Sequence, residues 1–432
     1  MSRVRLALPE LPRAVWILNG GMAVNTFGSG LTAPFLLIYL HNVRGFSVEL
    51  AGLVPTVHFV VALVFGVISG AAFDRIGGRA TAAAAAVLLA VGFGLFPLVR
   101  EAWQAFALAA VAGAGRGAFW PTFSGLLAAL TPPELRPAAY AVQRVLGNAG
   151  LALGSLAAGL IVSTSDPQTF TIIFVLSAAA TGVFALALAF VPPAGGTATV
   201  AAPGTYADVL RDRTFVALVA LNFAFVAAGV ALLNSVLPLY AKNDVGVGEE
   251  VIGAIFVVNT VAIIVAQFPV TTLLRGRRRM PALALMGLIW SIAWALALAA
   301  NTVSLAAGAA LLLTFGLVFA LGECIHGVVI GPLVADLAPA KTVGRYMAAW
   351  LTTAQLGFAV GPAVGAVALA YSPALLWAGA AAATAALGAA SLALESRLPP
   401  AARLSPAPPA VGGAEPTGEV AARRDVRPAA PH

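Results

Sequence analysis

Arg116, Glu323 and His326 stand inside long apolar stretches of a 432-residue sequence in which charged residues are few. Arg116 follows Glu101 by 15 residues, and Glu323 precedes Asp336 by 13 residues. At the rise of an α-helix these separations are about 22 Å and about 20 Å, so both charges would lie near the middle of a bilayer. Ionisable groups at that depth are costly, which makes them candidates for function.

A proton-carrying site is the chemistry that these three residues suggest. The charge of a carboxylate depends on its solvation, so a group exposed to each side of a membrane in turn can load and release a proton. We interpret Glu323 as the main proton carrier and Arg116 as a charge beside the same pathway. His326 shares a helix face with Glu323 and would extend the relay. The alternative is structural, with Glu323 capping a kink or bonding a neighbouring helix.

Other polar and aromatic residues in the apolar stretches are candidates for lining a substrate path, with ordinary packing as the alternative for each. Tyr140 and Arg144 are four residues apart and would share one helix face. The candidates are Asn25, Phe27, Trp120, Tyr140, Gln143, Arg144, Asn222, Asn234 and Asn259.

The segment GAAFDRIGGR at residues 70–79 joins two apolar stretches. Gly70 permits close packing of helices, and Gly77 permits a tight turn. Asp74 can pair with an arginine or lie against the N-terminus of another helix. Such a contact would act as a conformational latch, whereas a solvated turn is the alternative. The predicted latch residues are Gly70, Asp74, Arg75, Gly77, Arg79 and Arg345.

The composition indicates what must position these residues. Apolar residues make up 60% of the chain and charged residues 9%, against about 25% charged in soluble proteins. The chain therefore belongs in lipid, where helices satisfy their own backbone groups. Stretches of about 20 apolar residues predict twelve transmembrane helices. Their expected ranges are 14–40, 49–73, 80–99, 102–130, 138–162, 169–192, 214–241, 250–274, 280–300, 303–336, 343–371 and 373–394.

Arginine and lysine predict the orientation. With both termini in the cytoplasm, 20 of the 24 basic residues fall on the cytoplasmic side, as the positive-inside rule requires. This distribution accounts for the net charge of +7 without a nucleic-acid partner. We expect a multi-pass protein of the cell membrane (the inner or plasma membrane).

The two halves of the sequence resemble each other. At an offset of 207, Leu126 aligns with Leu333 and Arg116 with Glu323, and at an offset of 201, Tyr39 aligns with Tyr240. The alternative is chance similarity between helices rich in alanine and leucine. Such repeats occur in secondary transporters, with the substrate path between the halves. We expect an N-terminal six-helix bundle at 1–192, a cytoplasmic linker at 193–212, a C-terminal six-helix bundle at 213–394 and a disordered cytoplasmic tail at 395–432.

Several of these segments also resemble a known family. GAAFDRIGGR is similar to the signature loop of the major facilitator superfamily, and RGAFWPTFSGLLAALTPPELR to its fourth helix. GNAGLALGSLAAG resembles the fifth-helix motif of the drug/proton antiporter branch, and LGECIHGVVIGPLVADLAP the tenth helix of bacterial multidrug-type members. Two departures are that Ser155 replaces the usual proline of the fifth-helix motif and that LLRGRRRM lacks an acidic residue. The resemblance implies an all-α membrane protein with twelve transmembrane helices in two pseudo-symmetric bundles, and a role for Arg116 in proton coupling.

The expected function is proton-coupled efflux of small amphipathic, drug-like molecules by alternating access. Proton-coupled uptake of a metabolite or sugar is the alternative within transport, and a membrane-embedded receptor or enzyme the alternative from another class. A single cysteine, four histidines and the absence of a GxxxxGK motif argue against a metal site and ATP-driven pumping. We expect no cleavable signal peptide, no cofactor beyond the proton gradient and a monomer whose partners are its substrate, protons and the bilayer.

Overall fold

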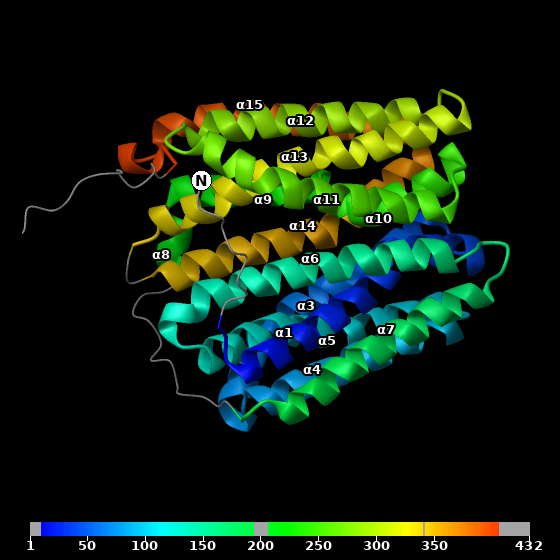
Figure 1. The fold of residues 1–432 in the computed structure, drawn as a ribbon. Coiled ribbons are helices and arrows are strands. Elements are labelled where there is room, and N and C mark those ends of the chain that lie inside the picture. Colours follow the sequence, from blue (N-terminus) through cyan, green and yellow to red (C-terminus); the bar gives the residue numbers. More distant parts are fainter. Residues whose placement is uncertain (1–9, 194–205, 340–341, 406–432) are drawn as a thin grey trace, which may run out of the picture.

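The computed structural model describes residues 10–193, 206–339 and 342–405, and almost all of them are helical. Two bundles lie side by side, one formed by the blue-to-green half of the chain and one by the green-to-red half (Figure 1). The N-terminal bundle contains α1 (Arg13–Thr32), α2 (Leu36–Ile38), η1 (Tyr39–Val43), α3 (Val48–Ile76), α4 (Gly78–Gly94), η2 (Phe96–Leu98), α5 (Ala102–Leu130), η3 (Pro133–Leu135), α6 (Arg136–Ile161), α7 (Gln168–Ala187) and η4 (Leu188–Phe190).

The C-terminal bundle follows a short helix, α8 (Tyr206–Arg211). It contains α9 (Arg213–Ala228), α10 (Val230–Tyr240), η5 (Ala241–Val245), α11 (Glu249–Leu274), α12 (Arg279–Ala300), α13 (Leu305–Leu337), α14 (Val343–Tyr371) and α15 (Pro373–Leu394). Because α1, α2 and η1 form one span, and α9, α10 and η5 another, the described residues make six spans in each half. The predicted fold class is therefore confirmed.

Eleven of these spans are long and apolar enough, by length and composition, to cross a membrane. The twelfth, α5, is not among them, although its 29 residues are ample for the thickness of the hydrocarbon core. It carries Arg116 and several glycines. Its middle is covered by the rest of the N-terminal bundle, since Gly113, Gly115 and Gly117 all contact neighbouring helices closely.

The repeat at offset 201 is visible in the hydrogen bonds. Tyr39 Oη donates to the carbonyl oxygen of Phe96 at 2.8 Å, and Tyr240 Oη donates to that of Ala297 at 2.8 Å. Each tyrosine stands at the start of a π-helical turn, in η1 and before η5. Each turn is followed by a glycine with positive φ, Gly45 at 73° and Gly246 at 81°, which is a conformation that glycine adopts readily. The two halves thus share a backbone plan as well as a sequence pattern.

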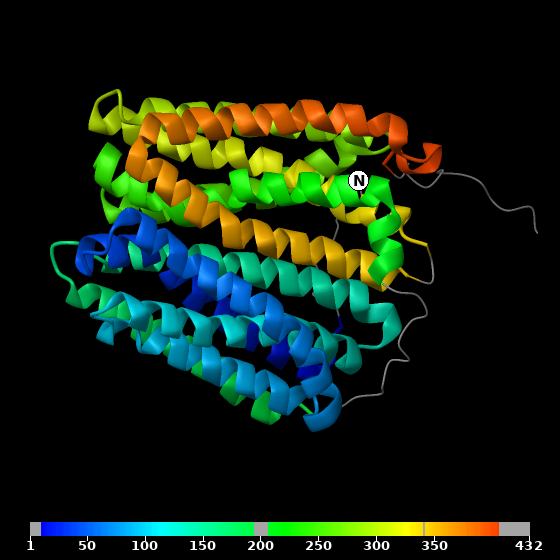
Figure 2. The same cartoon turned by 180° about the vertical axis from the view of Figure 1, so that it is seen from behind.

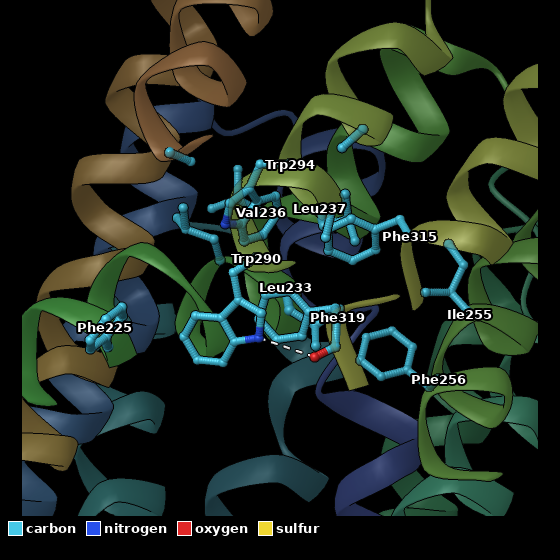
Figure 3. Close-up of a cluster of buried hydrophobic side chains, with 14 of the residues drawn as sticks. Phe225, Leu233, Val236, Leu237, Ile255, Phe256, Trp290, Trp294, Phe315 and Phe319 are labelled. Atoms are coloured by element: carbon cyan, nitrogen blue, oxygen red, sulfur yellow. Dashed lines mark hydrogen bonds between the residues drawn. The ribbon is translucent and has the colours of Figure 1, made fainter. Parts of the chain in front are cut away.

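A stack of aromatic side chains forms the core of the C-terminal bundle. Trp290 lies parallel to Phe319 with ring centroids 4.6 Å apart, and its Nε1 donates to the Phe319 carbonyl oxygen at 3.1 Å (Figure 3). Trp294 stacks on Trp377 at 5.0 Å. These fully buried rings tie α12, α13 and α15 together and give the bundle a rigid frame.

The prediction of a disordered tail from residue 395 onward was wrong for residues 395–405. Two short 3-10 helices, η6 (Glu395–Arg397) and η7 (Pro400–Ala402), follow α15 and pack against the start of α12, and they are visible in red at the end of the described chain (Figure 2). Arg278 pairs with Glu395 at 2.6 Å, and Ser405 donates its backbone N–H to the Arg277 carbonyl at 2.9 Å. We call residues 395–405 the strap. The rest of the predicted tail, 406–432, and most of the predicted linker lie outside the described residues.

Candidate functional site

A cavity of about 660 Å³ lies between the two bundles, at the middle of their helices. Its wall is mostly apolar, with phenylalanines from both halves, and is interrupted by amides, hydroxyls and a few ionisable groups. The polar and ionisable lining residues are Asn25, Thr26, Ser29, Thr32, His58, Arg116, Gln143, Arg144, Asn148, Asn234, Ser235, Asn259, Thr260 and Glu323. This size and mixture suit a drug-sized organic molecule.

Arg116 enters the cavity from α5 of the N-terminal half. Its guanidinium carbon lies 5.1 Å from the centre of the Phe59 ring, a cation–π arrangement. Its Nε is buried without a hydrogen-bond partner, and within the described residues Arg116 makes no ion pair. Phe59 was not singled out in the sequence, because an aromatic side chain in an apolar helix gives no sign of what it faces.

Glu323 enters the same cavity from α13 of the C-terminal half. Its carboxylate accepts a hydrogen bond of 2.6 Å from Nδ2 of Asn259 on α11, and Asn259 also donates to the Gly316 carbonyl at 3.4 Å. The amide holds the carboxyl group at a fixed place while leaving it on the cavity wall. Arg116 and Glu323, matched in the sequence repeat, therefore face one space from opposite halves.

His326 does not reach the cavity, although it lies one turn beyond Glu323. Its Nε2 lies 3.0 Å from Oδ1 of Asn222, and its ring stacks on Trp290 at 6.2 Å. Asn222 itself is fully buried and faces Thr353, with Nδ2 3.4 Å from Oγ1. His326 thus makes an internal polar contact of the C-terminal bundle.

The remaining substrate candidates divide into two groups. Asn25, Trp120, Gln143, Arg144, Asn234 and Asn259 line the cavity, whereas Phe27, Tyr140 and Asn222 are not among its lining residues. Asn25 also accepts a hydrogen bond from Thr181 Oγ1 at 3.0 Å. Tyr140 lies outside the cavity and donates to the Ser124 carbonyl at 3.2 Å. Helical spacing predicted which residues share a helix face, but not whether that face points toward the cavity.

One end of the cavity is closed by direct contact between the halves. We call this the far end; it carries loops 44–47, 162–167 and 246–248, and lies opposite α8, the described part of the predicted linker (Figure 1). Thr56 Oγ1 donates to the Ala359 carbonyl at 2.5 Å, and Phe59 stacks on Phe358 at 5.2 Å. Glycines allow the helices to meet, because a Cβ at Gly52 would lie 2.2 Å from that of Ala366.

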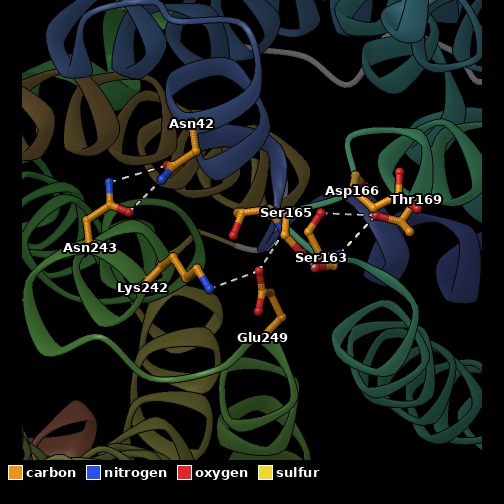
Figure 4. A network of polar contacts seen from close by, with 9 residues as sticks. Asn42, Ser163, Ser165, Asp166, Thr169, Lys242, Asn243 and Glu249 are labelled. Atoms are coloured by element: carbon orange, nitrogen blue, oxygen red, sulfur yellow. Dashed lines mark hydrogen bonds and ion pairs between the residues drawn. The ribbon is translucent and has the colours of Figure 1, made fainter.

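Polar contacts complete the closure at the far end (Figure 4). Asn42 and Asn243, which are equivalent in the repeat at offset 201, donate to each other's side-chain oxygens at 2.8 Å and 3.3 Å. Glu249 bridges the halves as well, accepting from the Thr164 backbone N–H at 2.9 Å while it pairs with Lys242 at 3.0 Å. The YxxN pattern shared by residues 39–42 and 240–243 is the sequence signal that indicates this asparagine pair.

The other end, which we call the linker end, is open. Arg144 lines the cavity and is exposed, and Asp74 and Arg75 are exposed at the end of α3. A Cβ added at Gly70 would meet nothing within 4 Å, so the close packing expected there is not present in this conformation.

Two other predicted latch residues, Gly77 and Arg79, lie at the turn and within the N-terminal half. Gly77 has a φ of 84°, which suits the tight turn, and Arg79 donates to the Val191 carbonyl at 3.4 Å inside the N-terminal bundle. Arg345 lies at the start of α14, half-buried. Asp74 makes no ion pair with any described residue, so the predicted latch is not engaged through it.

A family model decides what kind of protein this arrangement belongs to. The model of the Major Facilitator Superfamily matches residues 18–230 and again 219–428, once for each half. The chain belongs to the major facilitator superfamily. It is thus a multi-pass transporter rather than an enzyme, and the double match agrees with the repeat described above.

Relatives within the superfamily are distant. The chain is 26% identical over 369 residues to an uncharacterized MFS-type transporter, YttB, of Bacillus subtilis, covering 83% of this chain and 88% of that one. It is 25% identical over 343 residues to the multidrug resistance protein MdtH of Yersinia enterocolitica, covering 78% and 81%.

Solved structures share the fold. A D-xylose-proton symporter matches with a TM-score of 0.72 at 16% identity, covering 89% of this chain and 98% of the other. The nucleoside transporter NupG matches with a TM-score of 0.69 at 12% identity, covering 89% and 99%. At these identities the likeness establishes the architecture of this facilitator and leaves its substrate to be argued from its own cavity.

Proposed function

We propose that this facilitator exports small amphipathic molecules in exchange for protons, by alternating access of one central cavity. The observation that carries the proposal is the placement of Glu323 on the wall of a cavity between two bundles, which described contacts between the halves close at one end. A carboxylate there meets solvent from one side at a time, which is the condition for moving protons across the membrane.

The conformation described here would be the state open to the cytoplasm. The linker end carries most of the basic loop residues, which the positive-inside rule assigns to the cytoplasm. In the opposite state, the contacts of Asn42, Thr56 and Gly52 across the far end would separate. The latch around Asp74 would then close the linker end, with Arg345 on α14 as a partner from the other half.

Glu323 would carry the proton, and Arg116 would set the charge of the cavity opposite it. Asn259 donates to the carboxylate in this state and can accept from a protonated carboxyl group through its own oxygen, since an amide carries both donor and acceptor. His326 contacts Asn222 inside the C-terminal bundle and does not line the cavity. The proposed proton path therefore does not include it.

Export is favoured over uptake by the mostly apolar wall, which includes Phe59, Phe93, Phe256 and Phe358, and by the relatives named for multidrug resistance. Uptake of a polar metabolite with protons is the second candidate. It is supported by the amides of Asn25, Asn148 and Asn234 on the same wall and by the titles of the fold neighbours, which include a sugar–proton symporter.

A flux measurement separates the two candidates. Growth-inhibition panels in cells that overproduce the protein would first identify compounds to which it gives resistance. Purified protein in liposomes is then given one such compound and a pH gradient of either direction. We expect the compound to move toward the acidic side, against protons. Movement toward the alkaline side, together with protons, would support uptake, and flux that ignores the gradient would contradict proton coupling.

A further inference from the structure

The charges on the cavity wall are segregated between the two halves. The N-terminal half supplies Arg116 from α5, Arg144 from α6 and His58 from α3, whereas the C-terminal half supplies Glu323 from α13. Among the described lining residues there are no other ionisable groups. The cavity therefore has a cationic wall and an acidic wall that face each other across a space for one drug-sized molecule.

Neither arginine on the cationic wall has a carboxylate partner. Within the described chain, Arg116 contacts the Phe59 ring and leaves its Nε without an acceptor, and Arg144 makes no ion pair. Guanidinium groups bind carboxylates and phosphates in forked, charge-assisted hydrogen bonds. Two of them in a partly apolar cavity, without an ion-pair partner among the described residues, can bind an acidic group of the substrate.

The acidic wall has complementary chemistry. Only one oxygen of the Glu323 carboxyl group receives a described hydrogen bond, from Asn259, so the other oxygen remains for a ligand. A protonated amine can donate to it, and aromatic rings on both walls, such as Phe59 and Phe256, provide an apolar surface for a ring system.

We propose that the substrates are amphoteric: aromatic amphipathic molecules with an acidic group that binds Arg116 and Arg144 and a basic group that binds Glu323. This inference rests on the proposed function and names its substrate class. It also gives a physical reason for exchange, because the ammonium group and a proton compete for one carboxylate. When a protonated Glu323 binds the ammonium group, its proton leaves to the open side.

A matched set of three probes tests the proposal by binding alone, without transport. The probes are 6-(aminomethyl)naphthalene-2-carboxylic acid, which is amphoteric and carries its two groups at opposite ends of the ring system, its methyl ester, which is cationic, and its N-acetyl derivative, which is anionic. Binding to the purified full chain is measured calorimetrically at neutral pH. We expect the amphoteric probe to bind about tenfold or more tightly than either derivative, since each derivative leaves one wall unpaired. Equal affinities, tightest binding of the ester, or no binding of the amphoteric probe would overturn the proposal.

Two substitutions should then give a crossed pattern. Arg144→Gln should weaken the amphoteric and anionic probes about tenfold and leave the ester unchanged. Glu323→Gln should weaken the amphoteric probe and the ester and leave the anionic probe unchanged. Arg136→Gln, on the same helix as Arg144 but outside the cavity, and Glu250→Gln, exposed at the start of α11, are the matched controls. Parallel losses for all three probes would overturn the proposal.

Because these are binding measurements, they are independent of the flux assay. If the three probes bind with equal affinity to a protein that exchanges another compound for protons, the substrate class is refuted and the proposed function stands. If the substitutions give the crossed pattern but the protein shows no pH-driven flux, proton exchange is refuted and the amphoteric binding site stands.

Discussion

At its far end the N-terminal half places Tyr39 and Gly45 where the C-terminal half places Tyr240 and Gly246, with the same hydrogen bonds and the same backbone turn. On the cavity wall the match ends, because Arg116 of one half corresponds to Glu323 of the other. The halves thus share the residues that shape the helices and differ in those that face the cavity. A repeated scaffold is free to carry opposite charges wherever packing does not fix the residue.

The linker end shows a second difference. In the N-terminal half, Asp74 is exposed and Gly70 has open space beside it. In the C-terminal half, Arg279 is fully buried and pairs with Asp336 at 2.5 Å. Arg279 Nη1 also donates to the carbonyl of Ala402 in the strap at 3.3 Å. One half presents a free surface that can engage a partner in another state, and the other is fastened in place.

The largest effect on stability is expected where the C-terminal half is fastened. Asp336→Ala would leave the buried Arg279 charge without its carboxylate, which we expect to destabilise the protein by about 3 kcal/mol. Asp74→Ala removes an exposed carboxylate and should change stability by less than about 0.5 kcal/mol. Thermal unfolding in detergent, followed by loss of the monodisperse fraction, measures both. Equal shifts of Tm for the two variants would remove the contrast between the linker-end surfaces.

A smaller and conformation-specific effect is expected at the far end. Gly52→Ala would bring a methyl group into the Ala366 methyl group, so it should disfavour the closed far end by about 1–3 kcal/mol. Gly66→Ala on the same helix is the control, because its Cβ would lie 3.6 Å from the nearest atom.

Closure of the far end can be followed with a disulfide. Asn42→Cys and Asn243→Cys, combined with Cys324→Ala, place two thiols where the asparagine pair now bonds. Cross-linking should be rapid in this background, slower with Gly52→Ala and unaffected by Gly66→Ala. The same rate in all three proteins would show that α3 and α14 do not control the closure.

Much of the architecture could be predicted because lipid imposes it. The span expected at 49–73 became α3 (Val48–Ile76), and the one at 214–241 became α9, α10 and part of η5. Helix length follows from membrane thickness and from the need to satisfy the backbone, so single-sequence patterns suffice. The repeat was equally legible, since Tyr39 and Tyr240 stand in the same sequence context.

The site was harder to predict because it depends on contacts between distant segments. From the sequence, Asn259 and Glu323 were separate candidates, and the hydrogen bond between them could not be predicted. The sequence also suggested a relay through His326, whose side chain instead contacts Asn222. The strap was missed because its Pro-rich and Ala-rich composition resembles disorder, and it is ordered by Arg277 and Arg279, more than 100 residues away.

The most direct test of the account is coupled flux in Glu323→Gln, which keeps the shape of the cavity and removes its only described carboxylate. An exported compound is loaded into liposomes, and its movement is measured once as exchange against the same compound and once against a pH gradient, with Glu250→Gln as the control. We predict that the variant still exchanges the compound but no longer accumulates it against the gradient, whereas the control does both. Full pH-driven accumulation by Glu323→Gln would contradict the assignment of this carboxylate as the proton carrier.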